Sequence, residues 1–140
     1  MPSPELDNLV QAGLLNKEAP SAVEINGLTT SGEARVHDAL NEKLALESRF
    51  DLAYNGAHAL ALAALRRLGF RSDNRYAVFQ ALPYSLGVQA EVWRMLAKCH
   101  TLRNQFEYEG MSEVNERLVD DLVSAATSVR DALRAAVKGK

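Results

Sequence analysis

The stretch "SRFDLAYNGAHALALAALRRLGF", residues 48–70, decides the fold. Its middle is apolar on every side except at His58, and its many alanines allow neighbouring helices to approach closely. A helix that is apolar all round belongs in the middle of a bundle, because every side of it must be covered. The apolar run falls short of the roughly 20 residues that span a bilayer, so we do not expect a membrane helix. We expect Ser48 and Asp51 to form a capping box at its start, and Gly69 to end it.

Leucine, alanine and glutamate recur at helical spacing elsewhere in the chain, whereas the alternating runs typical of strands are almost absent. The sequence therefore predicts an all-α protein, an antiparallel up-and-down bundle of four to five main helices. We expect one domain overall. Residues 1–32 form a short N-terminal helix and a connector that pack on the bundle, and residues 33–140 form the bundle itself.

Local signals place the individual elements. Ser3 and Pro4 cap and begin a first helix that stops at Gly13. The glycine-, serine- and threonine-rich residues 16–32 predict a connector with at most a turn or two of helix, followed by a helix over residues 33–46.

The second half of the chain has similar signals. Asn74 caps a short helix that Pro83 ends or kinks, and Gly87 separates it from a helix over residues 88–109. Gly110 stops that helix and Ser112 caps the last one. The last helix carries an apolar stripe made of Leu118, Leu122, Ala125, Val129 and Leu133.

Composition excludes several classes of protein. At 140 residues and 47% hydrophobic, the chain can bury one sizeable core. A net charge of −2 gives no global positive field, so a nucleic-acid contact needs a local basic patch. The single cysteine, Cys99, and the absence of a basic, apolar leader favour a cytoplasmic protein. No glycine-rich phosphate loop, HExxH pair or GxSxG turn is present, so we expect neither a metal nor a cofactor.

The helix over residues 88–109 carries two faces. One is a seam for the bundle core, made of Val88, Val92, Met95, Cys99, Leu102 and Phe106. The other, at about 100° per residue, holds Trp93, Ala97, His100, Asn104 and Tyr108. Such a face is covered either by another helix of the same bundle or by a second subunit or ligand. We expect a homodimer interface at Trp93, His100, Asn104 and Tyr108.

Arg103 lies between these two faces, in the segment "TLRNQFEYEG", residues 101–110. It pairs with Glu107 on the helix surface, or it binds a phosphate together with Asn104 and His100. Tyr54 and His58, four residues apart, face the same cleft in this interpretation. The alternative for His58 is a buried imidazole that a neighbouring helix satisfies.

The order of these segments resembles the HEPN superfamily, in particular its small bacterial single-domain members. The resemblance rests on "AYNGAHALALAALRRLGF", "NRYAVFQAL" and "LRNQFEYEG", and it covers roughly residues 33–137. It implies a dimeric helical bundle of the kind found in toxin-antitoxin and nucleotidyltransferase-associated proteins. It also implies as partners a cognate nucleotidyltransferase-like or antitoxin protein, and RNA or a nucleotide.

Active ribonucleases of this superfamily carry an arginine, a polar residue, variable positions and then a histidine. The resemblance carries these roles over to Arg103, Asn104 and Tyr108, so a tyrosine stands where the family has its histidine. A phenol with a pKa near 10 is a poor proton acceptor at neutral pH, whereas imidazole near 6.5 is well placed. We therefore expect weak catalysis from Arg103 and Tyr108.

A second group of arginines lies in "RRLGFRSDNR", residues 66–75. Arg66, Arg67, Arg71 and Arg75 either hold a phosphate backbone at this corner or complement the negative end of the preceding helix.

Three functions stay open on the sequence alone. The first is a dimeric HEPN-like module that binds a nucleotide, RNA or a partner protein near Arg103. The second is an active, metal-independent ribonuclease toxin in which Tyr108 or His100 assists proton transfer. The third is a purely structural interaction protein in which Arg103, Asn104 and Tyr108 fix helix positions.

Overall fold

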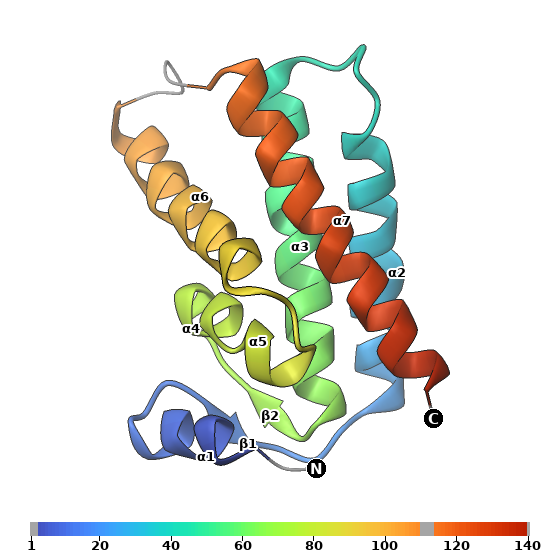
Figure 1. The fold of residues 1–140 in the computed structure, drawn as a ribbon, viewed down its shortest axis with the longest axis vertical. Helices are drawn as coiled ribbons and strands as arrows, with labels where there is room; N and C mark the ends of the chain where they lie inside the picture. Colours follow the sequence, from blue (N-terminus) through green and yellow to red (C-terminus); the bar gives the residue numbers. More distant parts are fainter. Residues whose placement is uncertain (1–2, 110–113, 140) are drawn as a thin grey trace.

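The structure, a computed structural model, describes residues 3–109 and 114–139. It confirms the all-α prediction, since these residues form seven helices and only one pair of two-residue strands. The four long helices are α2 (Ala22–Ala39), α3 (Leu46–Arg67), α6 (Ala90–Glu109) and α7 (Glu116–Lys138). Successive long helices run in alternate directions (Figure 1). Within the described ranges, no helix combines the length and the apolar character needed to cross a membrane.

Helix α3 forms the centre of the bundle. It packs most extensively against α2 and α7, and it also contacts α4 (Arg75–Gln80), α5 (Leu82–Ser85) and α6. Its side chains Phe50, Leu60 and Leu65 are completely buried. The apolar, alanine-rich sequence of this helix predicted a central position in the bundle, and α3 has that position.

Helices α2 and α3 approach each other closely, and their contact corrects the predicted connector. Helix α2 starts at Ala22, because Ser21 caps it by accepting a hydrogen bond from the backbone N–H of Glu24. A Cβ added to Gly32 would lie 2.7 Å from Cγ of Leu60, so the two helices touch where glycine leaves room. The glycine-rich segment is therefore part of a helix whose packing overrides its low helix propensity.

The ends of α2 and α3 also differ from expectation. The prediction of a capping box at Ser48 and Asp51 is wrong. Helix α3 starts earlier, at Leu46, and its N-cap residue Ala45 makes no side-chain hydrogen bond. Helix α2 ends at Ala39 instead of continuing to residue 46. The buried guanidinium of Arg49 donates from Nε to the Ala39 carbonyl at 2.9 Å, which satisfies one of the carbonyls left open at the end of α2.

The other local signals have the predicted effect. Ser3 caps α1 (Pro4–Gln11), and the side chain of Asn74 caps α4. The predicted stops at Gly13, Gly69 and Gly87 are positions of positive φ. The expected stop at Gly110 and cap at Ser112 lie outside the described residues; the side chain of Asn115 caps α7.

The N-terminal segment crosses one end of the bundle, where α1 lies beside the two strands (Figure 1). Strand β1 (Asn16–Lys17) pairs antiparallel with β2 (Phe70–Arg71), the segment that follows α3. A hydrogen bond of 2.6 Å from the Ser72 hydroxyl to the Leu14 carbonyl adds to this attachment. We call residues 3–21 the N-terminal arm.

Candidate functional site

Tyr54 on α3 and His100 on α6 lie at the centre of the candidate site. The Tyr54 ring is buried, and its hydroxyl lies 2.8 Å from Nδ1 of His100. The two rings are nearly parallel, with an angle of 15° and a centroid distance of 6.3 Å. The predicted proximity of Tyr54 and His100 is therefore present in the structure.

Two guanidinium groups contact the Tyr54 ring. Cζ of Arg75, the first residue of α4, lies 5.5 Å from the ring centroid, and Cζ of Arg103 on α6 lies 5.3 Å from it. Arg75 also donates a hydrogen bond of 3.1 Å to Oδ1 of Asn55. Cations over an aromatic face are attracted by its quadrupole. We name Tyr54, Asn55, Arg75, His100 and Arg103 the Tyr54 cluster.

The cluster shifts the pKa values of its two central groups in opposite directions. Burial raises the pKa of Tyr54, and a hydrogen bond from Arg75 opposes that shift. Burial lowers the pKa of His100, and the charges of Arg75 and Arg103 lower it further. Both groups are thus neutral at neutral pH.

These charge states define the hydrogen-bond roles. The charges of Arg75 and Arg103 make the neutral phenol a better proton donor, so we assign the Tyr54 O–H as the donor to Nδ1 of His100. The imidazole proton then sits on Nε2. His100 therefore offers an N–H donor rather than a free basic nitrogen, and the cluster presents hydrogen-bond donors and positive charge to a ligand.

His58, one turn after Tyr54, is half-buried, and its ring meets Phe79 edge to face at a centroid distance of 5.9 Å. Burial lowers its pKa to about 4, and the charges of Arg75 and His100 contribute. His58 is thus neutral and packed in the core next to the cluster.

The predicted interface stripe on α6 divides into two parts. Trp93 is half-buried and meets Tyr76 of α4 edge to face at 6.1 Å, and Ala97 is buried. Asn104, further along α6, is exposed. The protein's own α4 therefore covers part of the stripe near Trp93, while the side chain of Tyr108 lies outside the described residues.

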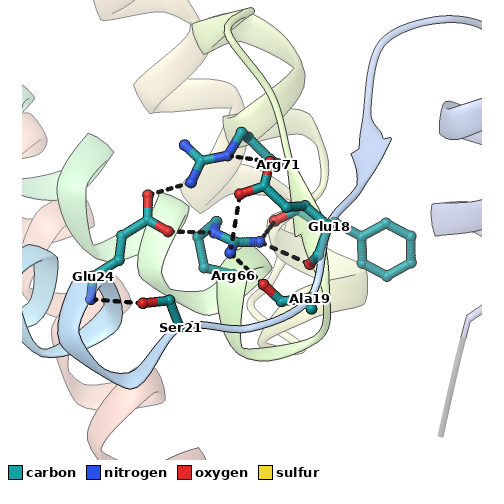
Figure 2. Close-up of polar contacts among 7 residues, drawn as sticks. Glu18, Ala19, Ser21, Glu24, Arg66 and Arg71 are labelled. Carbon is teal, nitrogen blue, oxygen red and sulfur yellow. Dashed lines mark hydrogen bonds and ion pairs between the residues drawn. The ribbon is translucent and has the colours of Figure 1, made fainter.

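The arginine corner of residues 66–75 serves mainly the fold. Figure 2 shows Arg66 enclosed between the N-terminal arm and the start of α2. Its guanidinium is completely buried and donates to Glu24 at 2.8 Å and to the carbonyls of Glu18 and Ala19 at 3.0 and 2.7 Å. Arg71 pairs with the carboxylates of Glu18 and Glu24. We name Glu18, Glu24, Arg66 and Arg71 the clasp.

The clasp decides between the two interpretations of this corner. Arg66 and Arg71 are held by carboxylates of the same chain, so they do not form the phosphate site that the sequence left open. Arg67 reaches the Ala136 carbonyl near the end of α7, at 3.5 Å. Of the four arginines, Arg75 alone belongs to the Tyr54 cluster.

Cys99 is buried on α6, and burial raises its pKa to about 12. It stays a thiol at neutral pH and packs as a small apolar side chain. Among the described residues, no group of three histidine, cysteine, aspartate or glutamate side chains lies close enough to hold a metal ion.

Comparison of the chain with protein-family models, with curated proteins and with solved structures finds no match.

Proposed function

We propose that this chain is a HEPN-like helical module whose Tyr54 cluster binds a phosphate group of RNA or of a nucleotide, within a system of the toxin-antitoxin type. One observation carries the proposal: two guanidinium groups converge on the same Tyr54 ring, at 5.5 and 5.3 Å from its centroid. An anion bound at this ring is attracted by both guanidinium groups. Arginine also matches phosphate oxygens in pairs.

The remaining members of the Tyr54 cluster favour the same ligand. His100 supplies an N–H donor because Tyr54 occupies its other nitrogen. Arg75, His100 and Arg103 are half-buried, so they remain open to solvent on one side while the buried ring fixes their positions. Preorganised donors of this kind lose little entropy when an anion binds.

The same hydrogen bond argues against strong ribonuclease activity. A general base needs a free lone pair within reach of the substrate hydroxyl. His100 shares its lone pair with the Tyr54 hydroxyl at 2.8 Å. Tyr108, with a phenol in place of the family histidine, is a weak acceptor at neutral pH. We therefore propose binding as the main activity.

The proposed homodimer uses the exposed end of the α6 stripe, at Asn104. A second copy against this end would bring a second Arg103 towards the Tyr54 cluster, as the resemblance implies. Sedimentation of the full chain over a range of concentrations tests this part separately.

Binding of a fluorescently labelled oligouridylate tests the proposed phosphate site. We expect Arg75→Ala and Arg103→Ala each to weaken binding by roughly tenfold and to reduce its salt dependence, since each removes one phosphate contact. Arg117→Ala, an exposed arginine near the start of α7, is the matched control and should leave binding unchanged. Equal affinity of all three variants and the wild type would overturn the proposal.

A further inference from the structure

Three aromatic side chains that do not belong to the Tyr54 cluster lie near one another on α4, α5 and α6. Tyr76 of α4 and Tyr84 of α5 are 42% and 46% exposed, which places them among the most exposed large hydrophobic residues in the described part of the chain. Trp93 of α6 lies between two depressions that these tyrosines help to line. We name Tyr76, Tyr84 and Trp93 the aromatic face. Tyrosine and tryptophan are the residues that most often anchor protein interfaces.

The two depressions form an open groove on both sides of Trp93. The first has a volume of about 380 Å³, and its walls are Tyr76, Trp93, Arg94, Ala97, Lys98 and Thr101. The second has a volume of about 250 Å³, and its walls are Glu5, Asn8, Leu9, Gln80, Tyr84 and Trp93. Small-molecule sites enclose most of their ligand, whereas shallow, adjoining depressions suit an extended chain that places a side chain in each.

The charges of the groove differ between its two ends. Arg94 and Lys98 are exposed at the first depression, and in the described part of the chain neither takes part in an ion pair. The second depression is lined by the carboxylate of Glu5 and by the amides of Asn8 and Gln80. One end of the groove thus attracts negative charge and the other does not.

We propose that this groove is a docking site for a peptide segment of a partner protein. In that segment an acidic residue lies next to a large apolar anchor. The anchor packs against Trp93 and Tyr76, and the carboxylate meets Arg94 and Lys98. The proposal does not rest on the phosphate site, because the groove and the Tyr54 cluster share no residue.

A single-stranded nucleic acid fits this groove less well. Such a strand carries a negative charge at every nucleotide, so its path across Trp93 would bring phosphate groups towards Glu5. A peptide needs only one acidic end, which agrees with the uneven charge of the groove.

Selection from random short peptides displayed on phage tests the proposal with the full chain as target. Three targets are compared in parallel: the wild type, the double variant Arg94→Glu/Lys98→Glu, and a control with equal charge change, Lys43→Glu/Lys138→Glu, at exposed positions outside the groove. We expect the wild type and the control to enrich peptides with aspartate or glutamate beside an aromatic or leucine residue. Circular dichroism checks that all three targets are folded.

Trp93 is the sole tryptophan of the chain, so its fluorescence reports on the groove directly. An enriched peptide, made synthetically, should shift this emission saturably, and Arg94→Glu/Lys98→Glu should weaken its affinity by roughly tenfold or more, because attraction becomes repulsion. Enrichment that is equal on all three targets, or that lacks acidic residues, would overturn the proposal. So would an emission change produced by oligouridylate but by no peptide, or by a rise in protein concentration alone, which would indicate a second copy at the groove.

Discussion

The Nε–H of Arg66, at the end of α3, donates to the carboxylate of Glu24, near the start of α2 and 42 positions earlier in the chain, at 2.8 Å. The guanidinium is completely buried, and three backbone carbonyls accept its other hydrogen bonds. A buried charge is tolerated only when its partners are complete. Removal of the Arg66 guanidinium is therefore expected to cost more stability than removal of one partner of a surface ion pair.

Replacement of Arg66 tests this expectation. Arg66→Met leaves the carbonyls of Glu18, Ala19 and Phe70 without their donor. We expect the free energy of unfolding to fall by about 3–5 kcal/mol, as when a buried pair loses one partner. Urea titration followed by circular dichroism measures the change.

Arg134 provides the matched control, because it also pairs with a glutamate on α2 but lies on the surface. Its guanidinium bonds Glu33 at 2.8 and 3.1 Å, and both side chains remain substantially exposed. Arg134→Met should lower stability by no more than about 1 kcal/mol. Equal losses for the two variants would contradict the special role of the clasp.

Two glycines on α2 should respond in opposite ways to alanine. Gly27→Ala adds a methyl group that meets nothing within 4 Å, and it replaces glycine in a helix, so we expect a gain of about 0.5–1 kcal/mol. Gly32→Ala places the same methyl group 2.7 Å from Leu60 and 3.1 Å from the Gly56 carbonyl. The strain should exceed the gain in helix propensity, with a net loss of about 1–2 kcal/mol.

Thermal unfolding of both glycine variants decides this point. A rise in melting temperature for Gly27→Ala with a fall for Gly32→Ala is the expected result. A rise for both would mean that α2 and α3 separate at little cost, in disagreement with the close contact at Gly32.

His58 should make the protein less stable in mild acid. Its folded-state pKa of about 4 is below the ordinary value of 6.5, so the unfolded chain takes up a proton at a higher pH than the folded one. The stability present above pH 6.5 is lost as the pH falls towards 4, by about 3 kcal/mol in total. Urea titrations at steps between pH 7 and pH 5 measure the first part of this loss, above the range in which carboxylates titrate.

Substitution separates the contribution of His58 from other groups. His58→Gln should flatten the stability profile between pH 7 and pH 5, and a residual slope is expected because the pKa of His100 is lowered too. A wild-type profile that is already flat in this range would contradict the prediction.

Local sequence signals predicted the helix ends that depend on one residue. Ser3 and Asn74 cap helices through their own side chains, and Gly69 and Gly87 adopt the positive φ that other residues avoid. Such features require no knowledge of the rest of the chain. The start of α2 has a signal of this kind in Ser21, but the glycines that follow it argued for a connector, and Gly32 is explained only by Leu60 on another helix.

In the candidate site, too, some features follow from local sequence and others depend on the packing of distant segments. Sequence spacing placed His100, Asn104 and Arg103 on one helix and Tyr54 near them, and Tyr54 and His100 do meet. The contact of Arg75 with the Tyr54 ring comes from the packing of α4 against α3 and α6. The pairing of Glu18 and Glu24 with Arg66 could not be predicted from the sequence, because both glutamates lie in the segment that was predicted to be a connector.

The strand pair and the clasp impose an order on folding during synthesis. Glu18 and Ala19 leave the ribosome before Arg66, which binds their carbonyls and follows 48 and 47 positions later. Until the last turn of α3 has been synthesised, the N-terminal arm lacks the Arg66 guanidinium to which its carbonyls bind. Helix α1 can therefore dock only after α3 is complete, and Leu6 and Leu15, which are buried in the folded protein, stay in contact with solvent until then.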